Sequence, residues 1–139
     1  ALDPASGVER EVKYGNSRFD LALGERADPH TFIEVKNVTL GPGPDDKDDG
    51  VIAFPDSVTE RGQKHLQTLM DVVASGKRAV LFFCVQHSGA TAARPADEID
   101  VRYGQLLREA IEKGVEVLAW KVTLSAEGFE LEKPLPIAL

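Results

Sequence analysis

The chain has 139 residues, of which 42% are hydrophobic and 28% charged, and its formal net charge is −7 at pH 7. This length suits one compact domain with a hydrophobic core, so residues 1–139 are expected to form a single domain. No apolar run is long enough for a transmembrane helix, no secretory signal is recognisable, and the negative charge argues against a broad cationic nucleic-acid surface while leaving room for a local one.

The first forty residues contain three segments with strand-like patterns. Strands are predicted over residues 10–14, 17–23 and 31–40, with turns over residues 15–16 and 24–29. Because short turns join consecutive strands as antiparallel neighbours, these segments predict a three-stranded β-meander. The second and third strands should therefore pair directly.

These two strands carry two acids and a lysine in the pattern D…ExK. Glu34 and Lys36 lie two residues apart and should project from the same face, while Val35 turns into the core. Asp20 comes from the preceding strand, so its carboxylate can meet that of Glu34. Two carboxylates suit Mg²⁺ or Mn²⁺, and a lysine beside such a metal can orient a water and stabilise phosphate charge. The pattern predicts a phosphodiester-cleaving nuclease site.

In this interpretation Asp20, Glu34 and Lys36 are the catalytic residues, and Asp20, Glu34 and the main-chain carbonyl of Val35 hold the metal. A simpler interpretation is an exposed acid–lysine ion pair, which stabilises little. The segments around both acids are rich in Phe, Leu and Ile, however. A buried carboxylate is unfavourable without a metal or another cation beside it, so the metal site is preferred.

An amphipathic helix is predicted next. Residues 41–50 are rich in Gly, Pro and Asp without the spacing of a calcium loop, so they predict a solvated surface loop. A capping box over residues 57–60 then opens a helix that runs to about residue 74. A solvated face is the ordinary role of the basic side of such a helix. Because the helix follows the ExK strand, we also predict that three of its residues bind a nucleic-acid phosphate: Arg61, Lys64 and His65.

The rest of the chain alternates between strand and helix. Residues 77–86 form a buried strand, residues 101–113 a helix capped by Asp97 or Asp100, and residues 115–124 another strand. A helix joining two strands predicts a parallel, right-handed crossover. The order βββ-α-β-α-β predicts a three-layer α/β/α fold with a central mixed sheet.

The single cysteine, Cys84, lies within the predicted strand at residues 77–86. It cannot form an internal disulfide, and a buried thiol is a more ordinary role for it than a nucleophile. Together with the absence of a recognisable signal, this favours a cytoplasmic protein with no membrane partner.

Four sequence blocks resemble one known family. Residues 14–20 (YGNSRFD), 34–40 (EVKNVTL), 54–66 (FPDSVTERGQKHL) and 94–100 (RPADEID) are similar to the sugar fermentation stimulation protein A (SfsA) family. The resemblance implies a restriction-endonuclease-like PD-(D/E)XK nuclease domain with Asp20, Glu34 and Lys36 in the motif positions. The family usually carries an N-terminal OB-like domain, so this chain is expected to correspond to the C-terminal domain.

The family's proteins are described as DNA-binding, with roles in maltose metabolism, so DNA is the expected partner and RNA the other candidate. Three functions stay open. The first is a Mg²⁺- or Mn²⁺-dependent nuclease. The second is a non-catalytic DNA-binding or regulatory protein of sugar metabolism that keeps the nuclease fold, and the third is a domain whose carboxylates hold a structural cation. The complete D…ExK set favours the enzyme.

Overall fold

The structure is a computed structural model that describes residues 8–14, 17–25, 28–38, 51–54, 58–86, 90–125 and 128–139. Its helices are α1 (Glu60–Ala74) and α2 (Val101–Glu112). Its strands are β1 (Val8–Tyr14), β2 (Ser17–Glu25), β3 (Asp28–Val38), β4 (Val51–Phe54), β5 (Arg78–Val85), β6 (Ala92–Pro95), β7 (Glu116–Ser125) and β8 (Gly128–Leu135). The turn predicted at residues 15–16, the loop at residues 41–50 and Ser57 of the capping box lie outside the described residues.

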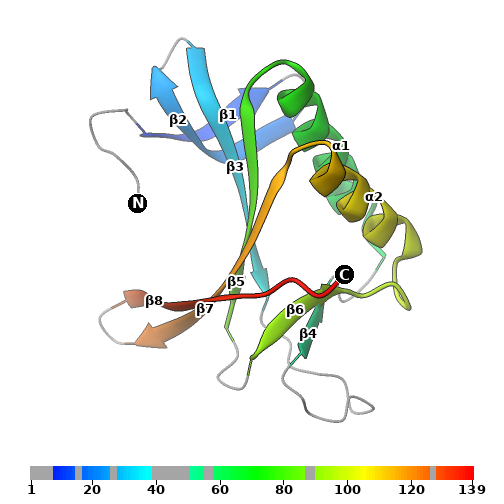
Figure 1. Cartoon of the computed structure of the whole chain (residues 1–139). Helices are drawn as coiled ribbons and strands as arrows, with labels where there is room; N and C mark the ends of the chain where they lie inside the picture. Colours follow the sequence, from blue (N-terminus) through cyan, green and yellow to red (C-terminus); the bar gives the residue numbers. More distant parts are fainter. Residues whose placement is uncertain are drawn as a thin grey trace.

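Six strands form one mixed sheet in the order β1-β2-β3-β5-β7-β8 (Figure 1). The β1–β2 and β2–β3 pairs are antiparallel, which confirms the predicted meander. The β3–β5 and β5–β7 pairs are parallel, as the two helical crossovers predict, and β8 returns antiparallel to β7. The prediction of an α/β domain with a central mixed sheet is therefore confirmed.

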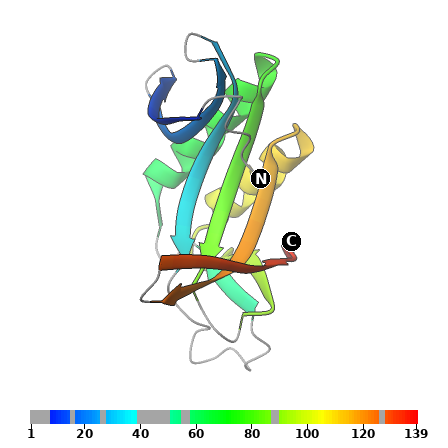
Figure 2. The ribbon, with the colours of Figure 1, turned by 90° about the vertical axis from the view of Figure 1, so that its left-hand side faces the viewer.

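Both helices lie on the same face of this sheet (Figures 1 and 2), where they also pack against each other. The expected three-layer arrangement is thus not confirmed in the described part of the chain. The physical reason is topological, because β3, β5 and β7 are consecutive neighbours. Right-handed crossovers that advance in one direction along a sheet place their helices on one face. Among the described residues, no helix is both long and apolar enough to cross a membrane.

The predicted element order lacks three of the observed strands. β4 and β6 pair in parallel as a separate two-stranded sheet, and β8 follows β7 at the edge of the main sheet. Strands of four residues contain too few positions for a periodic signal, so the sequence pattern does not predict β4 and β6. The element order is therefore β1-β2-β3-β4-α1-β5-β6-α2-β7-β8.

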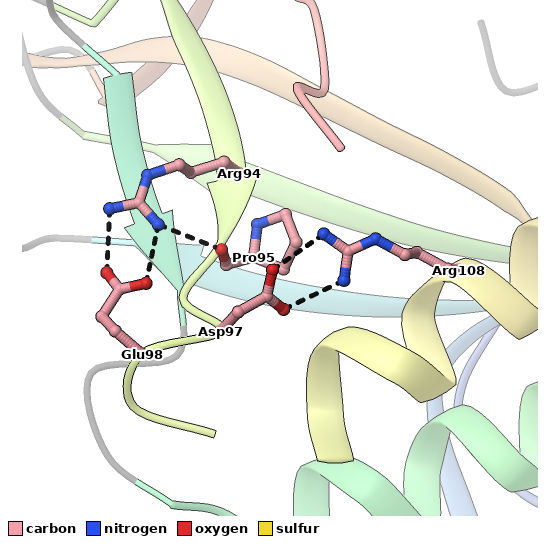
Figure 3. A network of polar contacts seen from close by, with 5 residues as sticks. All are labelled: Arg94, Pro95, Asp97, Glu98 and Arg108. Carbon is pink, nitrogen blue, oxygen red and sulfur yellow. Dashed lines mark hydrogen bonds and ion pairs between the residues drawn. The ribbon is translucent and has the colours of Figure 1, made fainter. Parts of the chain in front are cut away.

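Two arginine–carboxylate pairs fasten the segment between β6 and α2 (Figure 3). The Arg94 guanidinium donates to both carboxylate oxygens of Glu98, at 2.8 and 3.0 Å, and also to the carbonyl of Pro95. Arg108 of α2 donates in the same two-pronged way to Asp97, at 2.8 and 2.9 Å. Two-pronged pairs restrain geometry more than single contacts do. They hold the loop that leads into Asp100, the residue that caps α2.

Gly62 of α1 packs close to Tyr103 of α2. A Cβ at this position would lie 2.8 Å from Cγ2 of Thr59 and 3.1 Å from a ring carbon of buried Tyr103. We expect Gly62→Ala to lower the free energy of unfolding by about 1–2 kcal/mol, because this overpacking outweighs the better helix propensity of alanine. Urea denaturation measures the change. Gln67→Ala, on the exposed side of α1, is the control and should stay within about 0.5 kcal/mol of the wild type. A stabilised Gly62→Ala protein would contradict this packing.

Candidate metal and phosphodiester site

The site begins where β2 and β3 separate. Leu21 and Ile33 are paired across the two strands, and Asp20 and Glu34 lie immediately beyond this pair. There the Asp20 carboxylate replaces a strand partner, because its Oδ2 accepts a hydrogen bond from the backbone N–H of Val35 at 2.8 Å. This bond orients the exposed Asp20 side chain at the edge of the site. The predicted meeting of the two acids on adjacent strands is thus supported by the geometry.

Glu34 is a buried carboxylate, with only 5% of the residue exposed. Its register partner on β5 is Leu81, which is also buried. Burial raises the pKa of Glu34 to about 7, and the hydrogen bond and negative charge of Asp20 act in the same direction, against the charges of Lys36 and Arg61. Within the described part of the chain, Oε2 of Glu34 has no hydrogen-bond partner. A buried oxygen without a donor is a site that a cation would satisfy.

His65 of α1 completes the inner part of the site. Its Nδ1 lies 3.3 Å from Nζ of Lys36 and 3.6 Å from Oε2 of Glu34. Only 12% of the His65 side chain is exposed. Burial, and then the positive charges of Lys36 and Arg61, lower the pKa of His65, which favours the neutral ring. Helix α1 therefore places the His65 imidazole next to both Lys36 and Glu34.

The predicted orientation of β3 is correct in one respect and wrong in another. Glu34 and Lys36 do share a face, but this is the face that also buries Phe32 and Val38 beneath the helices. Val35 is half-buried and belongs to the opposite face, so the prediction that it turns into the core is wrong. Alternation along a strand assigns residues to two faces without telling which face the helices cover. The burial that the apolar neighbours predict for both acids is found for Glu34, whereas Asp20 is exposed, so that part of the prediction is wrong.

The other two predicted phosphate ligands lie on the solvent side of α1. Arg61 and Lys64 are exposed. The charge of Arg61 acts on both Glu34 and His65, so Arg61 is near the buried acid, whereas the charge of Lys64 acts on His65. The structure therefore brings Asp20, Glu34, Lys36 and His65 together, with the cations at their rim. Their binding to phosphate stays a prediction.

Asp100 is a supporting residue that the sequence suggests only as a helix cap. It is 4% exposed and accepts hydrogen bonds from the backbone N–H groups of Thr59 and Tyr103 and from the Gln63 side chain, each at 3.0 Å. Although burial opposes ionisation, these donors hold the pKa of Asp100 below its usual value. Because Thr59 caps α1 and Asp100 caps α2, this carboxylate joins the starts of both helices.

Tyr103 is a neighbour of the acids that the sequence does not reveal. The residue is buried, and its ring packs edge-on against Phe54. Burial raises the pKa of Tyr103, and the negative charges of Asp100 and Glu34 raise it further. The hydrophobic pattern of α2 predicts a core position for Tyr103, and nothing in that pattern indicates that the core extends to a carboxylate. The buried Tyr103 ring is thus part of the apolar surroundings of Glu34.

The donor set fits a hard divalent cation that retains much of its own water. Two carboxylates are available, Asp20 and Glu34, and one of their oxygens is buried without a donor. Among the residues that the structure describes, no three His, Cys, Asp or Glu side chains gather in a metal-binding arrangement. Mg²⁺ is commonly held by one or two carboxylates with waters completing its shell, so two acids suffice. The carbonyl of Val35 stays a predicted further ligand.

Known proteins resemble this chain over almost its whole length. The profile of the family described as "Sugar fermentation stimulation protein RE domain" matches residues 1–128. A sugar fermentation stimulation protein homolog from Alcanivorax borkumensis is 89% identical over 138 residues, which cover 99% of this chain and 58% of that protein. The structure of Pyrococcus furiosus SfsA in complex with Ca²⁺ is similar with a TM-score of 0.79 and 27% identity, over 94% of this chain and 54% of that one.

The chain thus spans 58% of the length of the first relative and 54% of the second. The family profile nonetheless covers far more than half of the chain, and the Alcanivorax relative is nearly identical in sequence. On these grounds, the chain belongs to the sugar fermentation stimulation protein (SfsA) family.

Proposed function

We propose that this chain is a Mg²⁺- or Mn²⁺-dependent nuclease domain that hydrolyses phosphodiester bonds of DNA, with RNA as the other candidate substrate. The observation that carries the proposal is the buried Oε2 of Glu34, which has no hydrogen-bond donor among the described residues, in a side chain close to Asp20 and Lys36. An acid pair with a lysine on adjacent strands of a mixed sheet also fits a restriction-endonuclease-like fold. The words "RE domain" in the family description agree with that fold.

Asp20 and Glu34 would hold the cation, with the Val35 carbonyl as a third protein ligand. When bound, a divalent cation supplies a water of lowered pKa and positive charge for the phosphate. The Pyrococcus furiosus relative was solved in complex with Ca²⁺, which supports a divalent-cation site in the family. Glu34 must release its proton to act as a ligand. Because its pKa is about 7 without metal, cation affinity should fall as the pH drops below that value.

Lys36 would orient the attacking water and stabilise developing negative charge on the phosphate. Lys36 projects from the same face as Glu34 and is half-buried as a residue, which restricts the direction of its side chain. Arg61 and Lys64 would contact the substrate phosphates from the exposed side of α1. A local cationic rim around an acidic centre reconciles phosphate binding with a net charge of −7.

A second function, a non-catalytic DNA-binding regulator of sugar metabolism, is supported by the names of the family and of the Alcanivorax relative. Both names refer to sugar fermentation stimulation. Such a protein would bind DNA with a strong salt dependence, because phosphate contacts release counterions. Its affinity would be indifferent to Lys36, and this indifference separates it from the nuclease.

The deciding experiment is a cleavage assay on single- and double-stranded DNA and RNA with Mg²⁺, with Mn²⁺ and with chelator. We expect cleavage only with metal and its loss in Asp20→Asn, with Asp71→Asn, exposed on the outer side of α1, as the active control. Calorimetric titration with Ca²⁺ tests the cation site separately and should lose its heat in Asp20→Asn. Cation binding without cleavage of any substrate would reject the nuclease and favour the regulator.

A further inference from the structure

The His65 ring has two nitrogens, and among the described residues only Nδ1 has a recorded polar neighbour in the site. Nδ1 lies 3.3 Å from Nζ of Lys36 and 3.6 Å from Oε2 of Glu34. If Nδ1 carried the proton, its natural acceptor would be the Glu34 carboxylate. The Oε2 atom of Glu34, however, has no hydrogen-bond partner among the described residues. Its distance of 3.6 Å from Nδ1 is too long for a hydrogen bond. The ammonium of Lys36, which can only donate, is within reach.

We propose that His65 is a positioning residue for Lys36: its unprotonated Nδ1 accepts a hydrogen bond from the lysine ammonium, and its proton resides on Nε2. This inference rests on the proposed nuclease function only for its catalytic consequence, because the hydrogen bond itself is a property of the chain without metal or substrate. The His65 side chain is only 12% exposed, and the next residue of α1, Leu66, is buried in the core. These surroundings fix the ring in place. A long, flexible lysine side chain thereby acquires a defined direction.

The arrangement divides the imidazole between two tasks. The two nitrogens of an imidazole point away from each other, so an Nε2–H group faces away from Lys36. There it is a neutral donor available to a phosphate oxygen, which reconciles the predicted phosphate role of His65 with its contact to Lys36. Since Lys36 is the residue that orients the attacking water, loss of the Nδ1 acceptor should lower turnover more than substrate binding.

The first test is the ¹⁵N NMR spectrum of the histidine rings at pH 8 without metal, with the His65 signals assigned from their loss in His65→Asn. We expect an unprotonated Nδ1 and a protonated Nε2. The Nδ1 signal should move in Lys36→Met, toward the position of a nitrogen without a hydrogen bond. Lys64→Met is the matched control, because Lys64 also places its charge near His65, and it should leave the tautomer and the Nδ1 signal nearly unchanged.

The second test compares two substitutions in the cleavage assay. His65→Leu should lower kcat by about tenfold to a hundredfold with KM changing far less, as expected from loss of orientation. His65→Asn places an oxygen acceptor near the position of Nδ1 and should recover most of that loss. A protonated Nδ1, an Nδ1 signal indifferent to Lys36→Met, or equal kcat values for the two substitutions would overturn the proposal. Absence of cleavage by the wild type and by both variants would reject the nuclease function. The NMR result would then by itself show whether the hydrogen bond between Lys36 and His65 exists.

Discussion

Replacing Lys36 with methionine should reduce metal-dependent cleavage by about 10²–10⁴-fold while leaving cation binding intact. Methionine keeps most of the apolar stem of lysine, so packing against the buried β5 neighbour Phe83 is retained. What is lost is the Lys36 ammonium beside the two acids, and with it the charge that would stabilise the attacked phosphate. The measurement is single-turnover cleavage of a labelled DNA duplex with saturating Mn²⁺, together with a Ca²⁺ titration of both proteins.

Lys113→Met is the matched control for the lysine substitution. Lys113 is an exposed residue at the end of α2, paired with Glu109. The Lys113→Met protein should cleave DNA like the wild type and bind the same amount of Ca²⁺. If Lys36→Met kept full activity, Lys36 would have no part in the chemistry. If it lost Ca²⁺ binding as well, the lysine would be organising the acids rather than acting on the substrate.

Replacing Glu34 with glutamine should stabilise the metal-free protein at alkaline pH. In the folded chain the pKa of Glu34 is about 7, against 4.5 for the ordinary side chain. Below pH 4.5 both folded and unfolded chains hold the proton, and the carboxyl imposes no penalty. As the pH rises from 4.5 to 7, the unfolded state ionises first and stability falls. Above pH 7 the penalty is about 3 kcal/mol, and glutamine removes it.

Urea denaturation in chelator at about pH 5 and about pH 8.5 measures this effect. The wild type and Glu34→Gln should differ little at the acidic pH, and the variant should be the more stable protein at the alkaline pH. Adding Ca²⁺ or Mn²⁺ at the alkaline pH should then stabilise the wild type and not the variant, because a bound ligand stabilises only the protein that binds it. Glu112→Gln, an exposed residue at the end of α2, should keep the wild-type pH dependence. Parallel pH profiles for wild type and Glu34→Gln would contradict a costly buried carboxyl.

The cation experiments also separate the two carboxylates. Asp20 is exposed and already accepts a backbone hydrogen bond from Val35, so Asp20→Asn should affect metal-free stability little compared with its effect on cation binding. Glu34 is the acid whose ionisation the fold opposes. In the proposed cation site, the backbone would therefore hold Asp20 in place, and a bound cation would offset the burial of the ionised Glu34. This asymmetry distinguishes a cation site from a pair of acids that only share the end of two strands.

Several parts of the molecule are predictable because they depend on local patterns. Alternating strands joined by short turns predict the meander, and helices between strands predict the parallel pairs, all of which the structure contains. Asp100 is a foreseeable cap of α2, since a side-chain acceptor before a helix satisfies free N–H groups. The spacing of Glu34 and Lys36 places both on one face, because side chains alternate along a strand.

Taken by itself, the sequence determined which residues carry the proposed chemistry, namely Asp20, Glu34 and Lys36, and on which adjacent strands they lie. Only the tertiary structure decided which sheet face the helices cover, and therefore that Glu34 is buried while Asp20 is exposed. It also brought His65 to Lys36 across 29 residues of sequence and joined both helix starts through Asp100. Strand periodicity assigns residues to faces, but burial and contact between distant segments arise only when the helices pack on the sheet.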